Sequence, residues 1–310
     1  MKVVVIGAGM VGSDVTGRLL AQGSISEIVL VDINQDKAEG EVMDYSHTTS
    51  YNYNPSASLE VGDYSDCQGA DLIVLTAGPS IKEGQSRRDL ALQNAQVTKE
   101  IMEQIIKYTT DALIIPVTNP VDVVTYTAVK SGYDRDKVIG TGTIVDSARL
   151  MRIIGNKYQL DPKNIFGYIL GEHGKVSFVP WSIAGICGYD FETFAQIRGL
   201  DVELNKKKIT KQVQQIGFDI WKKKGYTNHG IAAGVARIVK AISLDEEAVL
   251  PVSVYLDREY EIEGVALSVP CIIGEQGIEK ILEFPLTKEE LKKLEDAAKS
   301  LENTIKEIKV

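Results

Sequence analysis

Continuous apolar runs and helical repeats alternate at the start of the chain. Residues 3–6 form an uninterrupted β-branched run, which is typical of a strand buried on both faces in a parallel sheet. A glycine-rich turn at residues 7–12 follows, and residues 11–20 then continue with helical periodicity. A second apolar run at residues 28–31 ends in Asp32. This order predicts a strand, a tight turn, a helix and a second strand.

Two further buried-strand patterns extend the predicted sheet. They cover residues 71–76 and 113–118, and the segment between them has helical periodicity over residues 89–108. Parallel strands need such a crossover helix, because their ends lie at opposite edges of the sheet. The pattern predicts an α/β fold with a doubly wound parallel sheet of the Rossmann type.

The pattern changes near residue 142, beyond which longer helices accompany a few strands. Residues 231–242 are helical, residues 249–256 and 264–273 are strand-like, and a capping box at residues 287–290 opens a last amphipathic helix. No second glycine fingerprint is present in this half. We therefore expect two domains, a nucleotide-binding domain over residues 1–142 and an α+β substrate domain over residues 143–310.

The glycine turn and Asp32 together predict a dinucleotide site. Gly7 permits the tight turn, Gly9 lets a pyrophosphate approach the backbone, and Gly12 allows close helix packing. The N-terminus of the following helix presents unpaired N–H groups to the anion. Asp32 stands where a carboxylate accepts hydrogen bonds from the adenosine ribose and repels a 2'-phosphate, which favours NAD over NADP.

Charge and cysteine usage limit the expected partners and location. The net charge is −9, so attraction to nucleic acid or to an anionic membrane is weak. The three cysteines stand far apart, which fits neither a disulfide framework nor a metal site. No apolar stretch reaches the roughly 18 residues of a membrane span, and none resembles a signal peptide. We expect a soluble cytoplasmic protein that binds no metal.

Histidine is the side chain that titrates closest to neutral pH, and the chain has three. His173 follows the apolar pair Ile169 and Leu170, so we expect it at the mouth of a strand, where a catalytic imidazole would lie. On these residues alone, a catalytic histidine and an ordinary surface histidine both remain open. His47 and His229 are weaker candidates.

The motifs taken together resemble the lactate and malate dehydrogenase superfamily along essentially the whole chain. The similarity is greatest to L-lactate and L-2-hydroxyisocaproate dehydrogenases, which are L-2-hydroxy acid dehydrogenases. The stretches that carry the resemblance are GAGMVG (7–12), Asp32, TAG (76–78), EGQSRRDL (83–90), VTNPVDV (117–123), IGTGTIVDSARL (139–150), GEHG (171–174) and KGYT (224–227).

The resemblance implies a reversible hydride transfer between NADH and a monocarboxylic 2-oxo acid, and a role for each polar residue. His173 exchanges the proton, Asp146 orients its ring, and Arg149 grips the substrate carboxylate with a planar fork. Arg87 polarises the substrate carbonyl from a closing loop. Asn119 helps to orient the substrate and the imidazole.

Further residues follow from the same resemblance. Thr227 and Ile231 line the substrate pocket, and the Asn119–Pro120 peptide bond is expected to be cis. The implied cofactor-binding residues are Gly7, Gly9, Met10, Val11, Gly12, Asp32, Thr76, Ala77, Gly78, Val117 and Asn119. The resemblance also implies a homodimer or a homotetramer.

The sequence departs from familiar members of this superfamily in two places. Met151 and Phe166 occupy positions where members activated by a sugar bisphosphate carry arginine and histidine, which argues against such activation. Ile81 lies where oxaloacetate-reducing members carry arginine and typical lactate enzymes carry glutamine. Because an apolar side chain offers no partner to a second carboxylate, Ile81 favours pyruvate or a larger aliphatic acid such as 2-oxoisocaproate. If the Ile81 side chain instead points to solvent, it sets no preference among substrates.

Three alternative functions are compatible with parts of the pattern. Malate dehydrogenase acting on oxaloacetate is the main one. An NAD-dependent glycosidase would need metal-ligating cysteine and histidine near the nicotinamide, and no cysteine adjoins His173 in sequence. A nucleotide-sensing module without catalysis would have no need of His173, Asp146 and Arg149 together.

Overall fold

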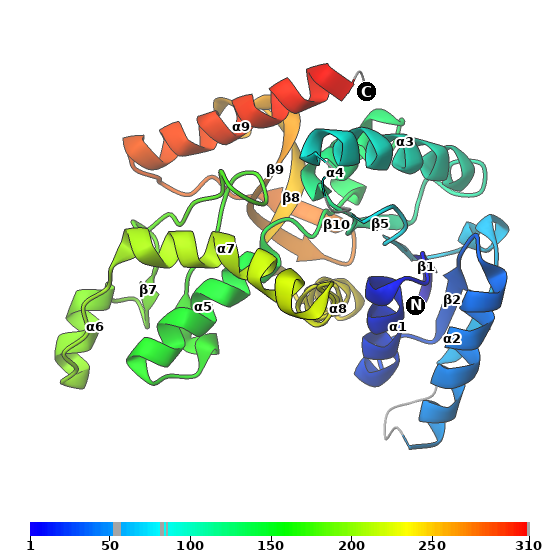
Figure 1. Ribbon diagram of the computed structural model, residues 1–310, viewed down its shortest axis with the longest axis horizontal. Helices are drawn as coiled ribbons and strands as arrows, with labels where there is room; N and C mark the ends of the chain where they lie inside the picture. Colours follow the sequence, from blue (N-terminus) through cyan, green and yellow to red (C-terminus); the bar gives the residue numbers. More distant parts are fainter. Residues whose placement is uncertain (52–56, 81–83, 85, 309–310) are drawn as a thin grey trace.

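A computed structural model describes residues 1–51, 57–80, 84 and 86–308 (Figure 1). The first half contains a five-stranded parallel sheet with the order β3-β2-β1-β4-β5. Its strands are β1 (Lys2–Ile6), β2 (Glu27–Val31), β3 (Ser58–Val61), β4 (Leu72–Leu75) and β5 (Leu113–Pro116). The helices of this half are α1 (Met10–Gln22), α2 (Gln35–Thr48), α3 (Arg87–Ile105) and α4 (Val121–Lys130). The predicted doubly wound α/β class is confirmed.

The strand order places a switch point between β1 and β4. Val3 pairs with Ile28 of β2 on one side and with Leu72 of β4 on the other. After β2 and β3 the chain crosses back over β1 to form β4, so the connections leave the sheet in opposite directions on either side of this point. Ligands of open α/β sheets bind outside the carboxyl ends of the strands at such a point.

The second half combines helices with small antiparallel sheets. Its helices are α5 (Ile144–Tyr158), α6 (Phe191–Arg198), α7 (Lys206–Lys224), α8 (His229–Ser243) and α9 (Lys288–Ile308). Its strands are β6 (Ile165–Phe166), β7 (Gly185–Ile186), β8 (Ala248–Asp257), β9 (Glu263–Gly274) and β10 (Gly277–Ile281). The order β10-β9-β8 forms one antiparallel sheet, while β6 and β7 form a second.

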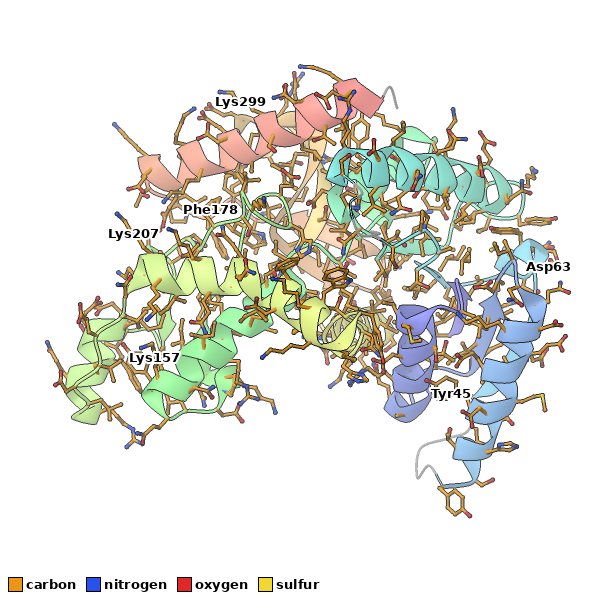
Figure 2. All side chains as sticks on the ribbon, in the orientation of Figure 1. Tyr45, Asp63, Lys157, Phe178, Lys207 and Lys299 are labelled. Atoms are coloured by element: carbon orange, nitrogen blue, oxygen red, sulfur yellow. The ribbon has the colours of Figure 1, made fainter. Side chains whose placement is uncertain are left out.

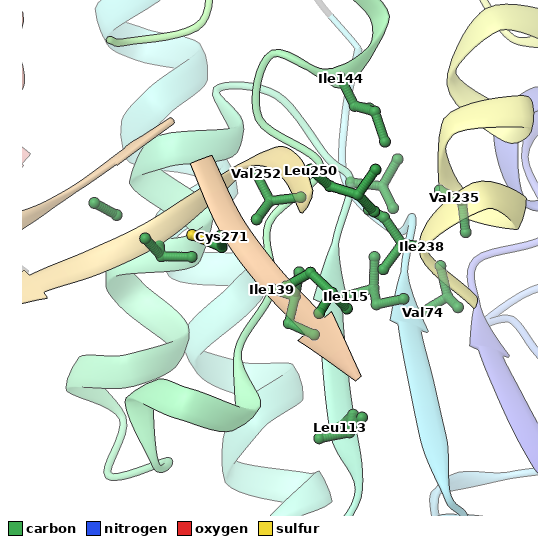
Figure 3. Close-up of a cluster of buried hydrophobic side chains, with 14 of the residues drawn as sticks. Val74, Leu113, Ile115, Ile139, Ile144, Val235, Ile238, Leu250, Val252 and Cys271 are labelled. Carbon is green, nitrogen blue, oxygen red and sulfur yellow. The ribbon is translucent and has the colours of Figure 1, made fainter. Parts of the chain in front are cut away.

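One apolar cluster joins the two halves of the chain. Figure 3 shows Val74 and Ile115 of the parallel sheet beside Ile238 of α8 and Val252 of β8, all of them fully buried. Burying such side chains stabilises the fold by about 1.5–3 kcal/mol each. In Figure 1, α8 lies between α1 and the helices of the second half. The halves are therefore packed together through a shared core.

The last helix has the cap that the sequence predicts. Thr287 N donates to Glu290 Oε2 at 2.9 Å, and Glu290 N donates to Thr287 Oγ1 at 3.3 Å. Leu294 and Leu301 of α9 are fully buried, while Lys299 of α9 and Lys207 of α7 extend outward (Figure 2). Over the described residues, no helix has the length and apolar character that a membrane span requires.

Candidate active site

The glycine turn after β1 lets neighbouring backbone segments pack closely against it. Gly7 adopts a φ of +108°, and a Cβ atom there would lie 2.7 Å from Ala77 N. A Cβ at Gly12 would lie 1.8 Å from Gly7 O, whereas a Cβ at Gly9 would meet nothing within 4 Å. Packing thus requires glycine at positions 7 and 12, whereas Gly9 leaves space beside the N-terminus of α1. The first turn of α1 carries no acidic side chain, so its positive end is available to an anion such as a pyrophosphate.

Asp32 lies over this turn at the carboxyl end of β2. Its Oδ2 accepts a hydrogen bond from Ala8 N at 2.6 Å, and its Oδ1 accepts one from Asn34 N at 2.8 Å. A shallow depression at the surface is lined by residues 32–36, within which the Ile33 side chain is fully exposed. A carboxylate beside an exposed apolar side chain fits a ribose and an adenine ring. The chemistry of these residues therefore fits the adenosine part of an NAD molecule.

The loops after β4 and β5 complete the same edge of the sheet. Thr76 Oγ1 donates to Gly7 O at 2.9 Å, and Thr118 Oγ1 donates to Ala77 O at 2.8 Å. Gly78 has a φ of +142°, and a Cβ there would lie 2.6 Å from Asn94 Oδ1. The other predicted cofactor residues on these loops and on α1 are Val117, which is buried, Val11, which is half-buried, and Met10, which is exposed.

Asn119 precedes α4 at this edge. The Asn119–Pro120 bond is cis, as predicted. Asn94 Nδ2 of α3 donates to Asn119 O at 2.5 Å and to Pro79 O at 3.2 Å, which ties the two loops together. The segment that carries Asn119 is therefore fixed in place by a side chain of α3.

His173, Asp146 and Arg149 meet at one place in the second half. Asp146 Oδ2 lies 2.6 Å from His173 Nδ1, and Arg149 Nη1 donates to Asp146 Oδ1 at 2.7 Å. Asp146 and Arg149 are three residues apart on α5, so their side chains share one face of that helix. The exposed fractions of the three side chains are 28% for His173, 6% for Asp146 and 17% for Arg149. The carboxylate is thus buried between two groups that neutralise it.

Electrostatics favour the charged form of both His173 and Asp146. Burial lowers the pKa of His173, but the charge of Asp146 and its hydrogen bond outweigh this effect and raise the pKa above the usual histidine value. Burial raises the pKa of Asp146, and the charges and hydrogen bonds of His173 and Arg149 outweigh it, so this pKa is lowered. Between these two pKa values an imidazolium faces a carboxylate.

The segment before His173 differs from the strand expected from sequence. Leu170 and Gly171 make only isolated bridges, to Phe178 and Ser268. Gly171 has a φ of +91°, which turns the backbone away from an extended path and ends the pairing. His173 consequently lies in a loop held by a few hydrogen bonds, and the prediction of a strand mouth is wrong.

Arg149 lies against helix α7. A Cβ atom at Gly217, in the interior of α7, would lie 3.3 Å from Arg149 Nη1 and 3.4 Å from Nη2. Glycine destabilises a helix interior by about 1 kcal/mol relative to alanine. An alanine here would make a tight contact with the guanidinium, and the hydrophobic periodicity of α7 gave no sign of this contact.

Thr227 and Ile231 lie at the start of α8. Thr227 is exposed in the α7–α8 connection, and Ile231 is half-buried in the first turn of α8. A Cβ at Gly230 would lie 3.3 Å from Val145 Cγ1, so this turn packs against the residue that precedes Asp146. The start of α8 is therefore a neighbour of α5.

Two predicted substrate residues, one on the loop before α3 and one at the start of α3, are not described fully. Ile81 lies outside the described residues, and Arg87 is the first residue of α3 with its side chain also outside them. Of the two departures noted for effector binding, Met151 is half-buried. Phe166 is 43% exposed and makes an edge contact with Tyr168, with ring centroids 5.0 Å apart.

Asp122 is a buried polar residue at the site for which the sequence predicts no role. It belongs to the VTNPVDV stretch, which indicates that this segment lies at the site but does not predict the contacts of Asp122. Its Oδ2 accepts a hydrogen bond from His173 N at 2.7 Å.

The doubly wound sheet, the glycine turn with Asp32, and the histidine–carboxylate pair beside an arginine define an NAD-dependent dehydrogenase. The comparisons with known proteins agree. Residues 1–140 match the family model described as lactate/malate dehydrogenase, NAD binding domain, and residues 143–310 match the one described as lactate/malate dehydrogenase, alpha/beta C-terminal domain. The chain belongs to the lactate/malate dehydrogenase family.

Several relatives are similar along almost their whole length. L-lactate dehydrogenase 2 of Clostridium acetobutylicum is 49% identical over 308 residues, which cover 98% of this chain and 96% of the relative. L-lactate dehydrogenase of Selenomonas ruminantium is 42% identical over 98% of this chain and 96% of its own.

Solved structures give the same result for the fold. The lactate dehydrogenase MGS-M5 from a Medee basin deep-sea metagenome library superposes with a TM-score of 0.94 at 34% identity, covering 100% of this chain and 99% of that one. The minor L-lactate dehydrogenase of Enterococcus mundtii gives 0.93 at 35% identity, covering 98% and 97%.

Proposed function

We propose that this enzyme reduces pyruvate to L-lactate with NADH and catalyses the reverse reaction with NAD. The observation that carries the proposal is the buried contact of His173 with Asp146, beside Arg149 on the same helix. The names of these relatives support pyruvate as the substrate. They do not favour malate dehydrogenase. Larger aliphatic 2-oxo acids such as 2-oxoisocaproate belong to the same substrate class.

The proton step is assigned to His173. When bound, the nicotinamide supplies the hydride that reaches C2 of the substrate. The carbonyl oxygen then gains negative charge and takes the proton from His173 Nε2, because Nδ1 is held by Asp146. Asp146 fixes the orientation of the ring and compensates the positive charge of the imidazolium. In the reverse direction neutral His173 accepts the hydroxyl proton.

Arg149 is assigned to the substrate carboxylate. A guanidinium has five N–H donors in a fixed fork, and one nitrogen of Arg149 is used on Asp146. The remaining donors can bind a carboxylate. Arg87, Asn119, Thr227 and Ile231 are proposed to complete the substrate site, with Ile81 excluding a second carboxylate.

The wider organisation follows from this assignment. We propose that residues 1–142 hold the cofactor and that residues 143–310 supply His173, Asp146 and Arg149. A cytoplasmic location is supported by three free cysteines, two of which are buried. A homodimer or homotetramer is proposed from the family resemblance, and sedimentation of the full chain tests it.

A substrate panel tests the proposed function. NADH oxidation is followed with pyruvate, oxaloacetate, 2-oxoisocaproate and phenylpyruvate under the same conditions. The expected result is the highest kcat/KM with a monocarboxylic acid, and pyruvate first among them. A preference for oxaloacetate would contradict the proposal, and so would the absence of NADH oxidation with every acid.

A further inference from the structure

Asp122 is a buried carboxylate behind the catalytic loop. It is the second residue of α4, its exposed fraction is 2%, and its two oxygens make different contacts. Oδ2 accepts a hydrogen bond from the backbone N–H of His173 at 2.7 Å. Oδ1 accepts one from Ser253 Oγ of β8 at 2.6 Å, and Ser253 is fully buried.

These contacts suit a carboxylate better than a carboxylic acid. Both partners donate to the ionised form, whereas a protonated Asp122 would donate to Ser253 Oγ and leave the Ser253 hydroxyl hydrogen without this acceptor. A buried donor left without an acceptor destabilises the folded state. The site is therefore arranged for a negative charge near His173.

Asp122 also connects three separate segments of the chain. It lies three residues after Asn119, and it reaches both the His173 loop and β8. Ser253 in turn exchanges two backbone hydrogen bonds of 2.9 Å with Gly140, at the end of the first half. Through Asp122, the backbone of His173 is fixed relative to the segment that carries Asn119.

We propose that Asp122 is a positioning residue that holds the His173 loop and, with Asp146, keeps the imidazole in its charged form. This inference rests on the proposed function, in which His173 supplies the proton. Asp122 acts on the ring through the loop and through its charge, since its hydrogen bond goes to the His173 backbone.

The charges around the two groups support this assignment. Asp146 and Asp122 both raise the pKa of His173 against the effect of burial, whereas Arg149 lowers it. Burial, with a smaller contribution from the charge of Glu172, raises the pKa of Asp122 to about 7, while the hydrogen bonds from Ser253 and His173 and the charge of His173 favour its carboxylate form. The side chain that β8 presents to Asp122 is the neutral Ser253. The charged neighbours of Asp122 on the loop are thus His173 and Glu172.

Histidine titration by NMR measures the effect without catalysis. The chain has three histidines, so 15N labelling gives few imidazole signals, and the His173→Gln variant assigns the one that matters. Asp122→Asn keeps the shape of the side chain: its oxygen can accept from His173 N, and its amide can donate to Ser253 Oγ. It removes the charge and reverses only the direction of the hydrogen bond with Ser253. The pKa of His173 is expected to fall by about one pH unit in this variant.

The same variant has a kinetic signature. In Asp122→Asn the high-pH loss of kcat/KM for pyruvate reduction is expected to shift to lower pH by the same amount as the NMR titration. The Kd of NADH should stay within about twofold, since the cofactor residues are untouched. Ser253→Ala is the second variant: it removes one hydrogen bond that stabilises the Asp122 carboxylate, so it should lower the pKa of His173 in the same direction, and it serves if Asp122→Asn does not fold.

Glu290→Gln is the matched control. Glu290 is also a buried acid, 6% exposed, and it accepts hydrogen bonds from Ser182 and Thr287 at the start of α9. Its replacement should lower the melting temperature and leave the His173 titration unchanged. An unchanged His173 pKa in both Asp122→Asn and Ser253→Ala would overturn the inference. Failure of the wild-type enzyme to reduce pyruvate would instead overturn the proposed function.

Discussion

His173 Nδ1 lies 2.6 Å from Asp146 Oδ2, so one nitrogen of the imidazole is committed to a buried carboxylate. The contact leaves Nε2 as the nitrogen that can exchange a proton with substrate. It also raises the pKa of His173 and lowers that of Asp146. The pH dependence of the enzyme follows from this pair.

Pyruvate reduction should be fastest below the raised pKa of His173 and should be lost as the pH rises through it, because the reaction needs the imidazolium. Lactate oxidation should show the opposite dependence, since it needs the neutral ring. Asp146→Asn should shift the pH dependence of both reactions to lower pH and slow pyruvate reduction by about 10²-fold. Profiles of kcat/KM in both directions measure this. If the pH profiles of Asp146→Asn coincide with those of the wild type, Asp146 does not set the charge of His173.

Asp32 should determine the choice between NAD and NADP. Asp32→Ala is expected to weaken NADH binding by about 1.5–3 kcal/mol, the contribution of a hydrogen bond to a charged group. NADPH binding should weaken less or improve, because the repulsion of a 2'-phosphate disappears. Fluorescence titration with both cofactors measures the change, and Asp44→Ala, an exposed acid on α2, is the control. Equal affinity of the wild type for NADH and NADPH would refute this role.

Gly217→Ala should change stability and substrate binding in opposite directions. Alanine stabilises a helix interior by about 1 kcal/mol relative to glycine, which raises the melting temperature. Its Cβ would press on the Arg149 guanidinium at 3.3 Å, so the KM for pyruvate should rise several-fold. Gly40→Ala on α2 is the control, because a Cβ there meets nothing within 4 Å and should raise stability alone. A KM unchanged by Gly217→Ala would mean that Arg149 tolerates the contact.

Ile81 should disfavour dicarboxylic substrates. The wild type is expected to show a kcat/KM for oxaloacetate at least about tenfold below that for its best monocarboxylic acid, because burying an unpaired carboxylate costs several kcal/mol. Ile81→Arg should reverse much of this difference by supplying the missing partner. Ile81→Gln, which adds polarity without charge, is the matched control. If it reverses the difference as fully as arginine does, charge pairing is not the cause.

The local features of the first half were predictable because neighbouring residues determine them. The β-branched run of β1, the glycine spacing and Asp32 lie within one strand–helix–strand unit, and the cis bond at Asn119–Pro120 followed from the family resemblance. The contact between His173 and Asp146 joins residues 27 positions apart. Only the family resemblance predicted that these two residues act together, since no sequence periodicity connects a histidine in a loop with an aspartate in a helix.

The contacts that were missed are those that depend on tertiary packing. Asp122 reaches Ser253 across 131 positions in sequence, and nothing in either segment signals the pair. Gly217 was not distinguishable from any other glycine in a helix until Arg149 was placed against it. The strand expected before His173 is absent: Leu170 and Gly171 make only isolated bridges, and the backbone turns at Gly171, where φ is positive.

Single-turnover oxidation of NADH with saturating pyruvate tests the central claim most directly, with the wild type compared to His173→Ala. The variant should be slower by about 10²-fold or more, since it lacks the group that gives the proton. Its Kd for NADH, measured by fluorescence, should remain that of the wild type. A variant that oxidises NADH within a few-fold of the wild-type rate would show that His173 is not the proton donor.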